Sequence, residues 1–289
     1  MRSIVTATCA IGMFVLATFG FAADPPKDSP EKPADAALRE KWQKDYREIA
    51  ESLEMRHDKT KLLLHDAPLL YYSNPVRGTD QHGTMFLWTE EGRPAVLGSV
   101  WSAMDRQKPT LRNITHEFHS LVEDSKIESL VDGKTRWASG EAGIAWQALA
   151  GTPAPEATRT GRLVQMRAIA RRLSASITAE EKNELRLLPQ PLYRYPDKTA
   201  GAVDGAVFVF ALATDPELVL LIEASADADT RVWKVAFARF GNLAMAVKDG
   251  ERTLWTCERG TPGRSAGKYY LYWRVEQRPA ELENSPAAK

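Results

Sequence analysis

The sequence predicts an α+β protein built from two tandem similar units, each an amphipathic helix packed on a curved antiparallel β-sheet, in a pseudo-twofold arrangement. Two segments carry apolar residues at helical spacing, and many shorter segments alternate apolar and polar residues between glycine turns, as strands do. The order of features also recurs: GTMFLWTEEGRPAVL, from Gly83, has a counterpart in GAVFVFALATDPELV, from Gly205. This similarity indicates an internal repeat, although two antiparallel sheets can also share such patterns by convergence.

The N-terminus predicts export. Arg2 precedes a long apolar run without charges, and Gly20 and Ala22 are the small residues of a cleavage site after Ala22, so residues 1–22 resemble a signal peptide. The run is about long enough to span a bilayer, which leaves an uncleaved anchor as the alternative. We expect a periplasmic or extracellular protein. Cleavage would leave Cys257 as the single cysteine, and therefore no intrachain disulfide.

The first unit is expected at residues 35–138, after a proline-rich disordered tether at residues 23–34. Asp35 is the expected helix cap, and an apolar stripe of Leu38, Trp42, Ile49 and Leu53 follows it. Turns at Glu91-Gly92 and Asp132-Gly133 predict hairpins, because their residues tolerate positive φ. The expected strands cover residues 61–72, 84–89, 94–103, 111–122, 126–131 and 134–138.

The second unit is expected at residues 158–278, after a linker at residues 139–157. Its helix carries a stripe of Leu163, Met166, Ala170, Leu173 and Ile177, and Thr178 with Glu181 predicts a further short helix through a capping box. The segment ELRLLPQPLYRY matches KLLLHDAPLLYY of the first unit, with Tyr195 at the place of Tyr72. The second unit has an extra C-terminal strand at residues 269–275, and residues 279–289 form a disordered tail.

The charges balance, with 38 Lys and Arg residues against 38 Asp and Glu residues. This balance gives no general attraction to nucleic acid. The chain contains no phosphate-binding loop, dinucleotide-binding turn, nucleophile elbow or cysteine cluster. We therefore expect no cofactor, no metal and no nucleic acid, and an unknown small molecule or envelope component as the partner. After signal cleavage we expect no integral membrane span, and the sequence leaves the oligomeric state open.

The densest polar cluster is THEFHS, at residues 115–120. Zinc proteases place two histidines four residues apart on a helix, but His116 and His119 are closer together, in an expected strand. Strand alternation puts His116 with Phe118 on one face and Glu117 with His119 on the other. Glu117 is then either solvated or paired, with His119 as the nearest partner.

The loop SNPVRGTDQHG, at residues 73–83, gathers Asn74, Arg77, Asp80 and His82 before the next strand. Arg77 could bind an anionic group, although Asn-Pro and glycine explain most of the loop as turns. The candidate ligand-binding residues are Arg77, Asp80, His82, Glu117 and His119.

The phrases THEFHS, LRLLPQPLYRY and TDPELVLLIEA carry a resemblance. With them the chain resembles a family of uncharacterised secreted bacterial proteins over most of residues 55–257. That family has no assigned activity. The resemblance therefore implies no substrate, cofactor or catalytic residue.

Two functions follow as expectations. The first is a non-catalytic binding or scaffold protein of the cell envelope, with its ligand in the cleft between the two units. The alternative is a hydrolase-like enzyme with Glu117 as general base, His119 or His116 as its partner and Arg77 as an anion clamp. The enzyme needs these groups around one concave pocket.

Overall fold

A computed structural model describes residues 33–74, 80–196, 199, 201–225, 231–260 and 268–281, with side chains from residue 37 onward. The predicted signal peptide, most of the predicted tether, Arg77 and residues 282–289 of the predicted tail lie outside these residues. Among the described helices, none is both long and apolar enough to cross a membrane.

The fold is a mixture of helix and mostly antiparallel sheet, with two helices among the described residues. The first half comprises α1 (Pro33–Ser52), β1 (Glu54–His57), β2 (Thr60–Lys61), β3 (Leu63–Leu64), β4 (Leu70–Ser73), β5 (Gln81–Glu90), β6 (Arg93–Met104), β7 (Leu111–Ser120), β8 (Ile127–Val131) and β9 (Lys134–Ala138). After β10 (Gln147–Ala148), the second half comprises α2 (Arg159–Arg172), β11 (Leu173–Thr178), β12 (Lys182–Leu187), β13 (Tyr193–Arg194), β14 (Ala202–Leu212), β15 (Asp215–Ser225), β16 (Trp233–Arg239), β17 (Ala244–Asp249) and β18 (Arg252–Cys257). The last strand is β19 (Tyr270–Pro279).

Strand pairing follows the same order in both halves. In the first half, β7, β6 and β5 are neighbours, β4 pairs with β5, and β1 lies between β2 and β8, which pairs with β9. In the second half, β16, β15 and β14 are neighbours, β13 pairs with β14, and β11 lies between β12 and β17, which pairs with β18. The second half forms one continuous nine-stranded sheet, whereas the first is divided into a six-stranded and a four-stranded sheet.

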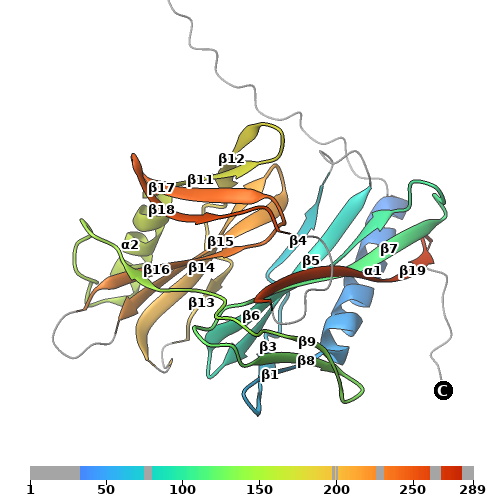
Figure 1. Ribbon diagram of the computed structural model, residues 1–289, viewed down its shortest axis with the longest axis horizontal. Coiled ribbons are helices and arrows are strands. Elements are labelled where there is room, and N and C mark those ends of the chain that lie inside the picture. The colour runs from blue at the N-terminus through green and yellow to red at the C-terminus, as the bar shows by residue number, and fades with distance from the viewer. Residues whose placement is uncertain are drawn as a thin grey trace, which may run out of the picture.

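The elements form four layers, with α1 and α2 on the outside and the two large sheets face to face between them (Figure 1). Strand alternation explains these layers. On β5, Phe86 and Trp88 pack beneath α1, whereas Met85 and Leu87 pack against the nine-stranded sheet. That sheet curls into a half-barrel around α2 (Figure 1). The contact between the sheets is therefore mainly apolar core.

The buried stripe of α1 differs from the expected one. Trp42, Tyr46, Ala50 and the following Leu53 are buried, at spacings that keep one helical face toward the sheet. Leu38, at the start of the expected stripe, is an exposed apolar residue. Tyr46 was missed because a tyrosine can lie on either a polar or an apolar face.

The second helix is shorter than its apolar pattern suggested. It ends at Arg172, and Leu173 and Ile177 lie in β11, where pairing with β12 and β17 supplies the backbone hydrogen bonds. The short helix expected from Thr178 and Glu181 is absent from the described residues, since Thr178 is the last residue of β11 and Glu181 lies in the turn before β12. Strand pairing has overridden the local capping signal.

The predicted hairpin turns are present. Glu91, Gly92, Asp132 and Gly133 all have positive φ, which is the geometry of a two-residue hairpin turn. The terminal strand is placed differently from the expectation that attached it to the second unit. It is β19, and it pairs along β7 of the first half. The expected linker also contributes β10, which extends the second half's sheet at β16.

Candidate functional site

Glu117 lies in the middle of β7 and points toward the nine-stranded sheet. The strand alternation expected for THEFHS is present, because Phe118 packs in the core beneath α1 and His116 lies against the rings of Phe118 and Trp273. His116 and Glu117 are therefore on opposite faces of the sheet. Burial, followed by the charge of Arg278, lowers the pKa of His116 to about 4, so its imidazole is neutral at physiological pH.

Glu117 is 7% exposed, so the face that it shares with His119 is buried between the sheets. Trp101 donates from Nε1 to Glu117 Oε2 at 3.2 Å, and the Tyr270 hydroxyl donates to Glu117 Oε1 at 2.5 Å. The sequence identified Glu117 but neither of these partners, because both contacts depend on long-range strand pairing.

His119 does not pair with Glu117. Its Nδ1 lies 2.7 Å from the Ser120 carbonyl oxygen, and its ring packs against Tyr269 and Tyr270. Complete burial lowers the pKa of His119 to about 3, although the hydrogen bond to Ser120 opposes this shift. The predicted partner of Glu117 is thus a neutral packing residue.

Two further carboxylates reach this region from the second half. Asp215 and Glu217 stand at alternate positions of β15, so both point to the same face, and Glu217 is 1% exposed. Asp215 accepts a hydrogen bond from the Asn74 side-chain amide, which joins the two halves. Gly241 lies beside the Glu217 carboxylate, where any added Cβ would clash with it.

Together these groups line a cavity of about 90 Å³ between the two sheets, which we call the inter-sheet cavity. Its walls come from β4, β5, β6, β7, β15, β19 and the β16–β17 turn. The residues that line it are Tyr72, Gln81, Trp101, Glu117, Asp215, Glu217, Phe240, Gly241, Asn242, Tyr270 and Tyr272.

The tyrosines of the inter-sheet cavity stay protonated. Burial, followed by the negative charges of Asp215 and Glu117, raises the pKa of Tyr72 well above its ordinary value. Burial and Glu117 act in the same way on Tyr270. These hydroxyls are therefore hydrogen-bond donors, and the Tyr72 hydroxyl lies 2.9 Å from Ser99 Oγ.

Comparison with models of protein families, with curated proteins and with solved structures found no match to this chain.

The other predicted site residues lie elsewhere. Asp80 and His82 line a different cavity, beneath α1, with Asp80 bound to Arg112 Nη1 at 2.8 Å. Arg77 lies outside the described residues. Among the described residues, no group of three His, Cys, Asp or Glu side chains is placed to hold a metal ion. The structure thus brings Glu117 together with acids and tyrosines, and not with a histidine.

The sequence analysis missed Asp215 and Glu217, although a signal for them exists. In DPELVLLIEA, two acids at alternate positions precede an apolar run, so they share one face of a strand that is otherwise typical of a core. Acids in such a strand must be paired, protonated or open to a ligand.

Proposed function

We propose that this chain is an exported, non-catalytic binding protein of the cell envelope whose inter-sheet cavity binds the cationic end of a small organic molecule, such as a primary ammonium group. The observation that carries this proposal is the lining of the cavity. Three carboxylates, those of Glu117, Asp215 and Glu217, converge there from both halves of the chain. Their negative charge favours a positive ligand group, and burial strengthens the attraction.

The aromatic walls favour the same ligand. Trp101, Tyr72, Tyr270 and Tyr272 line the cavity beside the acids, and the faces of such rings attract cations. A cavity of about 90 Å³ has room for one small polar head group and not for a whole sugar or peptide. The remainder of the ligand would extend outward.

The geometry gives less support to a hydrolase. The hydrolase hypothesis paired Glu117 with a histidine, yet His119, the expected partner, binds the Ser120 carbonyl instead of Glu117. Tyr270 and Trp101 donate to Glu117, which holds it as a hydrogen-bond acceptor. This arrangement suits binding better than proton transfer.

We also propose that the two halves descend from one duplicated unit. Support comes from the common order of strand pairing and from a shared detail, since Tyr72 covers Gly83 in the first half and Tyr195 covers Gly205 in the second. Face-to-face packing of the two copies then creates the inter-sheet cavity, which neither copy contains alone.

The test uses n-butylammonium as a probe and n-butanol as its neutral counterpart, with binding to the purified protein measured by calorimetry. We expect n-butylammonium to bind and n-butanol to bind at least tenfold more weakly. Glu217→Gln should weaken n-butylammonium binding about tenfold, whereas Glu251→Gln, at an exposed turn, should not change it. Equal binding of the two probes would refute a cation site.

A second variant tests whether a positive side chain of the protein competes with n-butylammonium for the carboxylates. Asn74 binds Asp215 and Gln81 lines the wall of the cavity, and Arg77 lies between these two residues in the sequence. Arg77→Ala removes the positive charge of the intervening segment. Tighter binding of n-butylammonium by this variant would support a cavity selective for cations, and loss of binding would count against it.

A further inference from the structure

A second cavity, of about 320 Å³, lies on the other face of the same sheet, beneath the start of α1. Strand alternation separates the two cavities. On β4, Tyr72 lines the inter-sheet cavity and Tyr71 lines this one. On β5, Gln81 lines the inter-sheet cavity and His82 this one. We call it the helix-side cavity.

Three rings wall the helix-side cavity. The ring centroids of Trp42 and His82 are 5.7 Å apart, and those of Tyr71 and His82 are 6.1 Å apart. The Arg112 guanidinium lies 5.5 Å from the Trp42 ring. Such walls favour a flat, aromatic ligand, because stacked and tilted ring pairs add to the gain from burying apolar area.

A chain of hydrogen bonds fixes the proton on His82. Arg112 Nε donates to Ser102 Oγ at 2.7 Å, Ser102 Oγ lies 2.5 Å from the Tyr46 hydroxyl, and that hydroxyl lies 2.9 Å from His82 Nδ1. If each hydroxyl donates to the next group, every hydroxyl proton has an acceptor and Nδ1 accepts. The proton of neutral His82 is then on Nε2, which has no partner among the described residues.

His82 is neutral at physiological pH. Burial, followed by the positive charge of Arg112, lowers its pKa to about 3, although Asp80 opposes this shift. The imidazole therefore offers a fixed N–H donor to the cavity. A fixed donor recognises an acceptor, and most strongly an anionic one.

The charges of the walls favour an anion as well. Arg39 and Arg112 carry two positive charges, and Asp80, which binds Arg112, carries the one negative charge among the lining residues. The lining of this cavity is thus net positive, in contrast to the acidic inter-sheet cavity.

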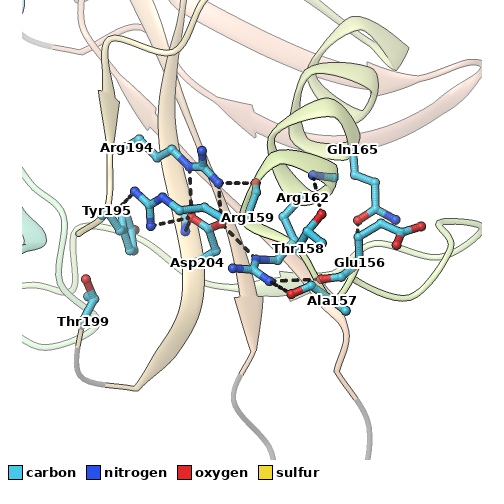
Figure 2. A network of polar contacts seen from close by, with 12 residues as sticks. Glu156, Ala157, Thr158, Arg159, Arg162, Gln165, Arg194, Tyr195, Thr199 and Asp204 are labelled. Atoms are coloured by element: carbon cyan, nitrogen blue, oxygen red, sulfur yellow. Dashed lines mark hydrogen bonds and ion pairs between the residues drawn. The ribbon is translucent and has the colours of Figure 1, made fainter. Parts of the chain in front are cut away.

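The position in the second half that corresponds to the helix-side cavity is filled by side chains. Arg194 precedes Tyr195 and Asp204 precedes Gly205, as Tyr71 precedes Tyr72 and His82 precedes Gly83. Arg194 Nη2 binds Asp204 Oδ2 at 2.7 Å, and Arg162 from α2 binds the same oxygen at 2.9 Å (Figure 2). Ion pairs fill this place in the second half, whereas aromatic rings border a cavity in the first.

We propose that the helix-side cavity binds a planar aromatic molecule with one anionic group, of the aryl carboxylate class. The ring lies against Tyr71 and His82, and the carboxylate accepts from His82 Nε2–H near Arg39. This site is independent of the proposed function, because it uses the opposite face of the sheet and a ligand of opposite charge.

The test uses 2-naphthoate as a probe, with binding to the purified protein measured by calorimetry. We expect 2-naphthoate to bind at least tenfold more tightly than neutral 2-naphthylmethanol and non-planar decalin-2-carboxylate. It should also perturb the nitrogen resonance of His82 Nε2. Failure of 2-naphthoate to bind, or equal binding of the three probes, would overturn the proposal.

Three variants test where the probe binds. His82→Phe keeps a ring but removes the N–H, and it should weaken 2-naphthoate binding about tenfold. Arg39→Ala should weaken it several-fold, whereas Lys41→Ala, an exposed residue of the same helix outside the cavity, should not. If His82→Phe does not fold, the comparison of Arg39→Ala with Lys41→Ala tests the proposal. Equal effects at residues 39 and 41 would place the probe elsewhere.

Discussion

The Tyr270 hydroxyl donates a 2.5 Å hydrogen bond to Glu117, although 153 residues separate the two in the sequence. The bond depends on the pairing of β19 with β7, which places Tyr270 opposite His119 and Tyr272 opposite Glu117. The C-terminal strand therefore completes a cavity whose other walls come from both halves.

Tyr270→Phe should lower the free energy of unfolding by about 2 kcal/mol, because a buried carboxylate then loses a charge-assisted hydrogen bond. Urea unfolding followed by circular dichroism measures the change. Tyr269→Phe is the matched control, since its hydroxyl has no hydrogen-bond partner among the described residues, and it should cost less than about 0.5 kcal/mol. Equal losses would show that the bond to Glu117 contributes nothing to stability.

His57, the last residue of β1, joins the end of β5 to the loop between β7 and β8. Its Nδ1 lies 2.6 Å from Glu90 Oε2 and its Nε2 lies 3.0 Å from Asp124 Oδ1. Burial lowers the pKa of His57, but the hydrogen bonds and charges of Glu90 and Asp124 outweigh it, so the pKa is raised overall. With both nitrogens engaged, this histidine stabilises the fold as an imidazolium.

His57→Asn should therefore destabilise the protein in a pH-dependent way. A raised folded pKa gives stability that is complete below the unfolded value of about 6.5 and is lost as the pH rises through the folded pKa. The difference in unfolding free energy between wild type and variant should be larger at pH 5.5 than at pH 9. A difference independent of pH would contradict the imidazolium assignment.

Asp204 forms ion pairs with three arginines near the start of α2, as Figure 2 shows. They are Arg159, Arg162 and Arg194. Burial raises the pKa of Asp204, but hydrogen bonds from Arg194 and Arg162 outweigh it and lower the pKa overall. Asp204→Asn should reduce the free energy of unfolding by about 3 kcal/mol, because the arginines lose their shared negative partner.

Thermal and urea unfolding at pH 7 measure the loss at Asp204. The matched control is Asp132→Asn, in an exposed turn where asparagine tolerates the positive φ. A depressed folded pKa gives stability that is present above the unfolded pKa and lost as the pH falls through the folded one. The difference at Asp204 should therefore shrink on acidification below about pH 4. If Asp204→Asn lowers the free energy of unfolding as little as Asp132→Asn does, hydration of the arginines replaces their ion pairs with Asp204.

Local sequence patterns predicted most strands and the turns between them. Glu91-Gly92 and Asp132-Gly133 form the expected hairpins, because positive φ is a property of the turn residues themselves. The capping signal of Thr178 and Glu181 failed for the opposite reason, since strand partners distant in the sequence compete for the same backbone.

The candidate site was predicted only in part. Glu117 was identified, but its face was expected to be solvated or paired with His119, because nothing local shows that a second sheet covers it. The strand around Phe86 held a clue: Met85 and Leu87 are apolar as well as Phe86 and Trp88, which indicates burial on both faces. Tyr270 could not be assigned to Glu117 without knowing how β19 pairs.

A tyrosine covers a glycine at the corresponding place in each half. A Cβ added to Gly83 would lie 2.8 Å from the Tyr72 hydroxyl oxygen and closer still to Trp101 Cβ, and one added to Gly205 would lie 2.5 Å from Tyr195 Cε2. Gly83→Ala and Gly205→Ala should therefore each lower the free energy of unfolding by about 2 kcal/mol through overpacking. Gly133→Asn should cost far less, because that turn has open space and asparagine tolerates its positive φ. Urea unfolding of the three variants measures this contrast. If only one of the two alanine variants is destabilised, the two halves do not share this packing.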